Sequence, residues 1–268
     1  MLSLRSLVLL PLLAFAALQD PPAVKDPVKE RLENSPRHHE WVEVKVGERK
    51  LSCFVTYPEV KGKVGAVLVI HENKGLNDWA RAVSDEFAEA GYIAIAPDLL
   101  SGAGPSGGKT DSFASSDAAT AALYKLDAAQ VSADLGATAD YVTKLEACNG
   151  KLSVAGGCWG GGQSFAFAAA RKGLKAAFVF YGSAPKDEAL AKIECPVYGF
   201  YGENDSRITA TVAATAETMK KLGKSFEPVT FAGAGHGFMR AGEATDASEA
   251  NKSARTDAWK RLKTLLGT

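Results

Sequence analysis

The chain is predicted to form an α/β domain with a mostly parallel central sheet, helices on both faces of the sheet and no large cap domain. Short apolar runs at residues 64–70, 92–96, 152–155, 176–181 and 197–201 alternate with segments whose apolar residues recur at helical spacing. Strands that are continuously apolar are buried on both faces, as in parallel sheets covered by helices. The length of 268 residues and the 46% hydrophobic content are sufficient for one such domain.

The first half of the chain supplies a hairpin and then the first repeats of strand and helix. Residues 41–57 alternate between apolar and polar around a turn at Gly47, which predicts an antiparallel hairpin. After the apolar run at 64–70, residues 77–90 have helical spacing and stop at Gly91. Residues 101–116 are rich in Gly and Ser, so we expect a loop there.

The second half continues the alternation. Helices are predicted over residues 127–145, 163–170, 209–222 and 248–266, and a further strand over 226–231. Because parallel sheets bind ligands at the carboxyl ends of their strands, the residues that follow each strand are the first candidates for a functional site.

The N-terminus is predicted to be a secretory signal peptide over residues 1–16. Arg5 is followed by the apolar run 7–13, and Ala14-Phe15-Ala16 offers a small-x-small cleavage site. The apolar run is shorter than the roughly 20 residues that span a bilayer. We therefore expect export to the periplasm or the medium, with the first helix of the folded domain or a membrane anchor as alternatives.

The remaining chain is predicted to be a lead-in segment and a single domain. Residues 17–39 are rich in Pro and charge and are expected to be a mobile or surface-bound lead-in, and residues 40–268 form the domain. Lys and Arg together number 31, as do Asp and Glu, so the charge favours no nucleic-acid partner. We expect a monomer with a small-molecule partner, and no membrane contact after signal cleavage.

No cofactor and no metal ion are expected. Residues 102–107 read Gly-Ala-Gly-Pro-Ser-Gly and residues 108–110 read Gly-Lys-Thr, but both lie in the predicted loop 101–116 and neither opens a predicted helix, so no Gly-rich loop calls for a nucleotide. No His/Cys spacing resembles a zinc site.

Cys158 occupies the centre of a Gly-x-Cys-x-Gly turn between an apolar strand and a small-residue helix. This layout is typical of a nucleophile elbow, in which a tight turn lifts one side chain above the sheet. Gly156 and Gly160 would be needed because the strand and the helix nearly touch there. The alternative is a buried structural cysteine in a Gly-rich turn.

Asp205 and His236 follow two later strands, so that the chain order is nucleophile, acid, histidine, as in α/β-hydrolases. A thiol is mostly un-ionised at neutral pH, and His236 could take its proton while Asp205 orients the imidazole. Glu203 is a rival for the acid. The backbone N–H of Trp159, at the start of the elbow helix, would face a developing oxyanion.

Glu72 ends the strand that precedes the first sheet helix, where hydrolases place their second oxyanion donor. The backbone N–H of Asn73 is the natural candidate for that donor, and the Glu72 carboxylate would project toward the site. A surface glutamate near a helix is the alternative.

Three cysteines remain outside the elbow. After export Cys53, Cys148 and Cys195 would be in an oxidising compartment. Two alternatives therefore remain: one disulfide between two of them, or three buried free thiols.

Taken together, these residues resemble the dienelactone hydrolase family of α/β-hydrolases, from about Trp41 to the terminal helix. The resemblance lies in residues 71–77, 91–99, 156–162, 201–205 and 235–238. It implies a triad of Cys158, Asp205 and His236 with backbone donors at Trp159 and Asn73. It also implies that Glu72 pairs with the resting thiol and accepts its proton when substrate binds.

The resemblance further implies a substrate class. Named members open cyclic enol-lactones whose carboxylate is bound by arginines; Arg240 matches one of them, but no Arg lies near Gly102, where the other would fall. We therefore expect an exported hydrolase of a small ester or lactone that works through a thioester. An acyltransferase, a broader carboxylesterase or depolymerase, and a non-catalytic binding protein are the alternatives.

Overall fold

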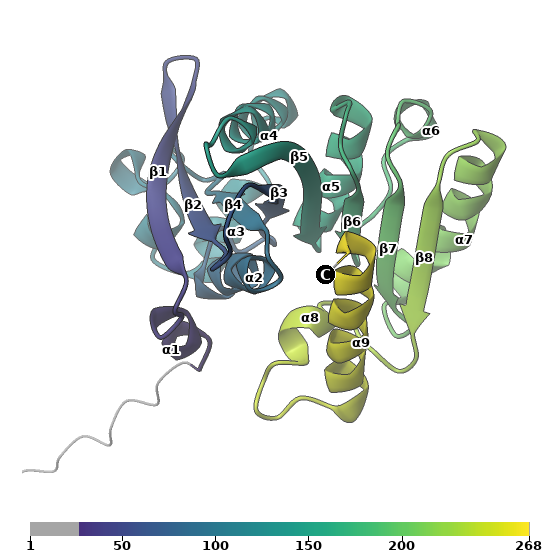
Figure 1. Cartoon of the computed structure of the whole chain (residues 1–268). Helices are drawn as coiled ribbons and strands as arrows, with labels where there is room; N and C mark the ends of the chain where they lie inside the picture. Colours follow the sequence, from purple (N-terminus) through teal and green to yellow (C-terminus); the bar gives the residue numbers. More distant parts are fainter. Residues whose placement is uncertain (1–26, 268) are drawn as a thin grey trace, which may run out of the picture.

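The computed structural model describes residues 27–267, and the predicted signal peptide lies outside them. Within this part an eight-stranded sheet has the order β1-β2-β4-β3-β5-β6-β7-β8 (Figure 1). The strands are β1 (His38–Val46), β2 (Arg49–Tyr57), β3 (Val64–Ile70), β4 (Ile93–Pro97), β5 (Cys148–Gly157), β6 (Ala177–Phe180), β7 (Val197–Gly202) and β8 (Phe226–Phe231).

Helices connect these strands and cover the sheet. They are α1 (Pro27–Glu33), α2 (Asp78–Glu89), α3 (Ser116–Leu123), α4 (Ala128–Thr143), α5 (Trp159–Ala170), α6 (Asp187–Leu190), α7 (Ser206–Lys221), α8 (Phe238–Ala241) and α9 (Glu249–Leu266), with short 3₁₀ turns at Pro105–Gly107 and Thr110–Ser112.

The predicted α/β fold is confirmed. β1 and β2 form the expected antiparallel hairpin, and β2 also pairs antiparallel with β4. Across the sheet from β4 to β8 every neighbouring pair is parallel, with at least one helix between successive strands. The carboxyl ends of these strands therefore lie on one edge of the sheet.

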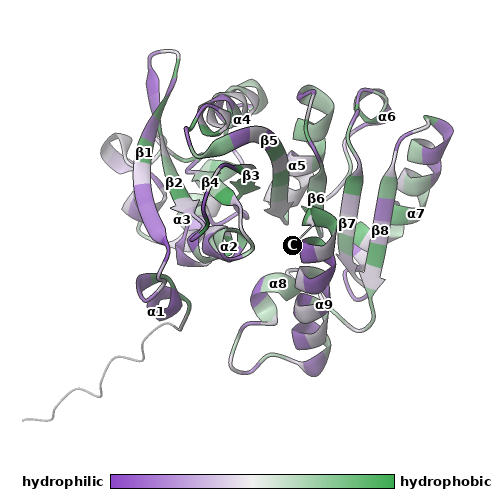
Figure 2. Ribbon diagram, in the orientation of Figure 1, coloured by the Kyte–Doolittle hydropathy of each residue, from purple (hydrophilic) through white to green (hydrophobic). Residues whose placement is uncertain are grey.

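Two hydrophobic cores explain the continuous apolar runs. Ala66, Leu68 and Ile70 of β3 face the core under α4, α5, α6 and α7, whereas Val67 and Val69 face the core under α1, α2, α8 and α9. Successive side chains of a strand point to opposite faces, so a strand buried on both sides needs apolar residues throughout. Figure 2 shows the central strand β3 in green and the edge strand β1 mostly in purple and white.

The structure adds four α-helices that the sequence prediction lacked, namely α1, α3 and the short helices α6 and α8. α1 lies within the segment expected to be a lead-in, and Leu32 is buried in the core under α2. α3 begins at the end of the expected loop, where Ser115 caps it by accepting a hydrogen bond from the N–H of Ala118. Among the described helices none combines the length and apolar content needed to cross a bilayer.

Candidate active site

Cys158 lies at a strained turn between β5 and α5. Its backbone has φ 54° and ψ −120°, a conformation that a residue with a side chain rarely adopts. The turn is anchored because the N–H of Cys158 donates to the carbonyl of Phe180 at 3.0 Å. The predicted elbow geometry is therefore present in the backbone, with the thiol partly exposed at the carboxyl end of the sheet.

Glycines allow the strand and helix to approach each other at this turn. A Cβ on Gly156 would lie 2.3 Å from the carbonyl oxygen of Gly160. A Cβ on Gly160 would in turn lie 2.3 Å from the carbonyl oxygen of Ile70 and 2.4 Å from that of His71. Both distances are far below a van der Waals contact, so the start of α5 rests directly on the backbone at the end of β3.

The structure brings His236 and Asp205 into contact. His236 lies in the loop between β8 and α8, and its Nδ1 is 2.5 Å from Oδ2 of Asp205. Asp205 is buried just before α7. The rival acid Glu203 is exposed and accepts a hydrogen bond from the N–H of Gly233 instead. Asp205 is thus the acid that can orient the imidazole.

Cys158 and Asp205 act on His236 together. The pKa of His236 is raised to about 9. Hydrogen bonding to Cys158 raises it most, burial lowers it, and the hydrogen bond to Asp205 raises it further. Hydrogen bonding to both neighbours favours the protonated form of the imidazole. The arrangement can therefore keep a proton on His236 at neutral pH.

Glu72 follows β3 and points toward the same edge, but its hydrogen bonds differ from the expectation. The Tyr181 hydroxyl donates to Oε1 at 2.9 Å, and Nε of Arg240 donates to Oε2 at 3.3 Å. Cys158 is not among the hydrogen-bond partners of the carboxylate in the described part of the chain, so the expected Glu72–Cys158 pair is not formed in this conformation. A guanidinium and a phenol are stronger donors than a thiol, which explains the preference.

Tyr181 is a site residue that the sequence reasoning missed. It is buried, its φ is 40°, and its ring packs edge-to-face on His236 at 5.1 Å between centroids. Burial, and then the neighbouring charge of Glu72, raise the pKa of Tyr181 well above its ordinary value, so the hydroxyl stays protonated as a donor. Its position at the end of the predicted strand 176–181 was the available signal.

The two predicted oxyanion donors lie on adjoining elements. Trp159 is the first residue of α5, and Asn73 is in the loop between β3 and α2. The contact of Gly160 with the backbone of Ile70 and His71 fixes these elements relative to each other. Arg240, on α8, has a half-exposed side chain beside Glu72.

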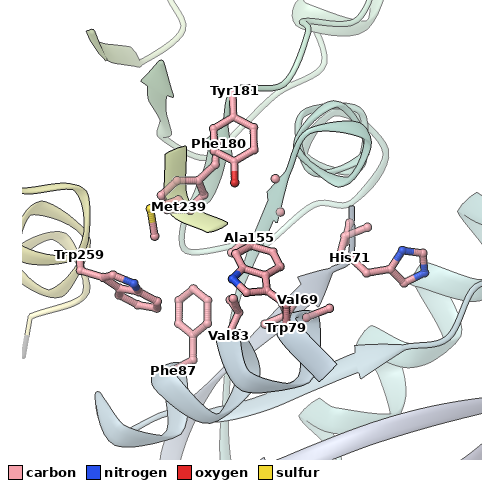
Figure 3. A pocket seen from close by; sticks show the side chains of 14 residues that line it. Val69, His71, Trp79, Val83, Phe87, Ala155, Phe180, Tyr181, Met239 and Trp259 are labelled. Carbon is pink, nitrogen blue, oxygen red and sulfur yellow. The ribbon is translucent and has the colours of Figure 1, made fainter. Parts of the chain in front are cut away.

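A small apolar cavity of about 30 Å³ adjoins the site (Figure 3). Gly157 and Tyr181 line it on the side of the elbow, and the hydroxyl of Tyr181 points toward its middle in Figure 3. Side chains from α2, α8 and α9 form the opposite wall: Trp79, Val83, Phe87, Met239 and Trp259.

All four cysteines of the chain are unpaired in the structure. Cys53, Cys148 and Cys195 are buried free thiols, so the structure has no disulfide between any two of them. Burial raises the pKa of Cys53 to about 12 and that of Cys195 to about 11. Residues 27–267 contain no group of three or more His, Cys, Asp or Glu side chains placed to bind a metal ion.

Comparison with known proteins places this geometry in a family. A model of the dienelactone hydrolase family matches residues 51–268. A candidate carboxymethylenebutenolidase from Methylorubrum extorquens is 27% identical over 233 residues, which cover 82% of this chain and 78% of that protein.

Solved structures agree with the fold. A candidate dienelactone hydrolase from Klebsiella pneumoniae has a TM-score of 0.75 at 24% identity, covering 87% of this chain and 99% of that one. A dienelactone hydrolase-like promiscuous phosphotriesterase from metagenomic libraries has a TM-score of 0.73 at 20% identity, covering 86% and 98%.

Proposed function

The chain belongs to the dienelactone hydrolase family and is therefore a hydrolase of carboxylic esters, and we propose that it cleaves a small ester or lactone through a thioester on Cys158. The observation that carries this proposal is the 2.5 Å contact between His236 and Asp205 at the carboxyl ends of two strands. Cys158 lies at the end of a third strand, close enough to raise the pKa of His236.

The first half of the reaction forms the thioester. The thiol proton of Cys158 passes to Glu72 and the sulfur bonds to the substrate carbonyl carbon. The carbonyl electron pair moves onto oxygen, which faces the N–H groups of Trp159 and Asn73. When the intermediate collapses, the carbon–oxygen bond to the leaving group breaks and His236 gives its proton to that oxygen. In a lactone, the leaving oxygen remains attached to the acyl group.

The second half releases the acid. Neutral His236 takes a proton from water, the water oxygen bonds to the thioester carbonyl carbon, and sulfur departs as a thiolate beside the imidazolium. Glu72 then returns its proton to the sulfur, which restores the resting enzyme. Asp205 stabilises that imidazolium and keeps Nδ1 protonated, which leaves Nε2 for the reacting groups.

Arg240 and Glu72 suggest an acidic substrate. The Arg240 side chain is about half exposed, at 46%, so an incoming carboxylate can reach its guanidinium. Such a carboxylate would compete with Glu72 for Arg240 and release Glu72 toward Cys158, where it can accept the thiol proton. This step would couple substrate binding to activation of the nucleophile.

Export completes the proposal. Residues 1–16 are proposed to be a signal peptide that directs the enzyme to the periplasm or the medium. Expression of the full chain in a bacterium, followed by fractionation and N-terminal mass analysis, tests it: a mature periplasmic chain starting close to residue 17 supports export, and an intact cytoplasmic chain contradicts it.

The decisive experiment compares Cys158→Ala with Cys148→Ala on a panel of short chromogenic esters and lactones, with and without a free carboxylate. We expect Cys158→Ala to abolish turnover and Cys148→Ala to retain it. Rapid quenching of the wild type with a slow ester should give a mass increase equal to the acyl group on the peptide that contains Cys158. Full turnover by Cys158→Ala would refute the mechanism.

The same experiment separates the alternatives. An acyltransferase would pass the acyl group to an added alcohol or amine faster than to water. A binding protein on this scaffold would bind members of the panel and turn over none of them.

A further inference from the structure

His71 is buried at the end of β3 and both of its ring nitrogens have partners, although the mechanism above gives it no task. Its Nδ1 is 2.8 Å from the carbonyl oxygen of Glu72, and its Nε2 is 3.3 Å from the backbone nitrogen of Leu99. In Figure 3 its imidazole points away from the other labelled residues that line the apolar cavity.

These two contacts determine the tautomer. The backbone N–H of Leu99 can only donate, so Nε2 of His71 has to accept. The ring proton then lies on Nδ1 and is donated to the carbonyl oxygen of Glu72. Burial lowers the pKa of His71, which agrees with a neutral ring in this position.

The carbonyl of Glu72 and the N–H of Asn73 belong to one peptide group. Because that group is planar and trans, a hydrogen bond that fixes the direction of its C=O also fixes the opposite direction of its N–H. The Glu72 carbonyl also accepts a longer bond from the N–H of Gly75, at 3.3 Å against 2.8 Å for His71. We infer that His71, the nearer donor, is a positioning residue that aims the Asn73 N–H at the substrate oxyanion. This inference rests on the proposed function, in which Asn73 is an oxyanion donor.

The bond to His71 also acts on the strength of that donor. A hydrogen bond accepted by a peptide oxygen polarises the peptide and makes its N–H a better donor, as in other hydrogen-bond chains. The neutral His71 would thus strengthen the Asn73 N–H without placing a charge beside the site.

A second contact links His71 to the other donor. Its ring is stacked on that of Trp159, with 5.8 Å between centroids and 16° between planes. The backbone N–H of Trp159 is the first oxyanion donor, and Gly160 rests on the carbonyl of His71. One side chain therefore contacts both halves of the proposed oxyanion hole.

The test uses two conservative variants that separate the two ring nitrogens. The amide nitrogen of Asn is as many bonds from Cβ as Nδ1 of His, so His71→Asn can still donate to Glu72. In His71→Gln the amide group lies at the distance of Nε2, so the contact with Leu99 is retained and the bond to Glu72 is lost.

We expect His71→Gln to lose about 10²-fold in kcat with little change in KM, the size of effect seen when an oxyanion donor is disturbed. His71→Asn should stay within about tenfold of the wild type, less than the cost of a lost donor. Alkylation of Cys158 by iodoacetamide should proceed at the wild-type rate in both, because this displacement develops no oxyanion.

Equal losses of kcat in the Asn and Gln variants would overturn the inference, and so would a parallel loss of alkylation, which indicates a collapsed site. The two proposals fail in different experiments. Full turnover by Cys158→Ala would refute the nucleophile, whereas the His71 variants leave Cys158 in place and test only the positioning of Asn73. Should both variants fail to fold, the ¹⁵N signals of His71 in the wild type decide: protonated Nδ1 supports the inference, and protonated Nε2 contradicts it.

Discussion

At the scale of single residues, burial and side-chain direction decide which of two acidic residues, Asp205 or Glu203, contacts His236. Asp205 is buried against His236, whereas Glu203 is exposed and bonded to Gly233. The sequence order predicts an acid after β7 but does not distinguish these two. The difference arises because Asp205 lies at the start of α7, where the chain turns back toward the sheet.

Asp205→Asn should lower kcat by about 10³- to 10⁴-fold, because the amide can no longer select the Nδ1-protonated imidazole or stabilise the imidazolium. Glu203→Gln is the matched control and should keep near wild-type turnover. Steady-state kinetics on a short ester measures both. Equal losses of kcat in the two variants would show that turnover depends on the structure of the loop and not on the contact between Asp205 and His236.

The pH dependence of turnover should also follow His236. With a pKa of about 9, its proton is present below that pH and is lost above it, so proton donation to the leaving group weakens as the pH rises through 9. We expect the alkaline limb of the kcat/KM profile there, because kcat/KM follows the ionisation of the free enzyme. A limb near the ordinary histidine value of about 6.5 would contradict the Cys158–His236–Asp205 arrangement.

At the scale of elements, the junction between β3 and α5 determines the precision of the site. Gly160→Ala places a methyl group against two backbone carbonyls that cannot rotate away, so α5 has to move off β3. We expect a loss of about 1–3 kcal/mol in the free energy of unfolding, together with a large loss of kcat as the two oxyanion donors separate.

Gly162→Ala is the matched control two residues further along α5, where a Cβ would lie 3.6 Å from its nearest neighbour. Alanine favours a helix over glycine by about 1 kcal/mol, so this variant should be as stable as the wild type or more so. Denaturant titrations and ester kinetics on the pair provide the measurement. If Gly160→Ala were equally neutral, the close packing of α5 on β3 would not determine the site.

The helices α1 and α3 could not be predicted because residues distant in the sequence stabilise them. α1 is seven residues long and is stabilised by distant partners: Arg31 forms ion pairs with Glu86 of α2 and with Glu243 beyond α8. α3 depends on a third small core in which Leu123 packs with Leu100. The long strands and helices carry their own periodicity and were predicted to within a few residues.

At the scale of the whole molecule, residues 27–39 are held against the body of the enzyme by contacts with two acidic residues of α2. Asp85 is buried and accepts hydrogen bonds from Ser35, Arg37 and His39. Glu86 pairs with Arg31 and with Arg255 of α9, so three helices meet at one carboxylate. The segment predicted to be a mobile or surface-bound lead-in is thus, over these residues, bonded to the domain.

Glu86 should make the whole fold sensitive to pH. Burial raises its pKa to about 7 despite Arg255 and Arg31, so the folded state binds a proton that the unfolded state releases near pH 4.5. Stability contributed by that proton is present at low pH and is lost as the pH rises toward 7. Between pH 5 and 8 the contribution is at most about 3 kcal/mol.

Urea titrations of the wild type and Glu86→Gln at pH 5 and pH 8 measure this effect. We expect the variant to lose less stability than the wild type between the two values, because its amide does not titrate. The other titrating groups are common to both proteins and cancel in the difference. Identical pH dependence in the two proteins would indicate that Glu86 keeps its charge throughout.

The topology accounts for how much of the site could be predicted. Cys158, Asp205, His236 and Glu72 each follow a parallel strand, and parallel strands end on one edge, so their proximity follows from the order of elements. The direction of the Glu72 side chain could not be predicted in the same way. It depends on Tyr181 and Arg240, whose positions are set by a strained backbone and by the short helix α8.

The buried cysteines make the folded protein chemoselective. Cys53 and Cys195 lie in the core with thiol pKa values of about 12 and 11, and Cys148 is also buried, so a water-soluble electrophile meets a single accessible sulfur. A fluorophore added to the native enzyme would report on one defined position without removal of any other cysteine. In denaturant a short pulse of the same reagent would label all four cysteines of unfolded molecules and Cys158 alone in folded ones. The stoichiometry after the pulse therefore reports the folded fraction.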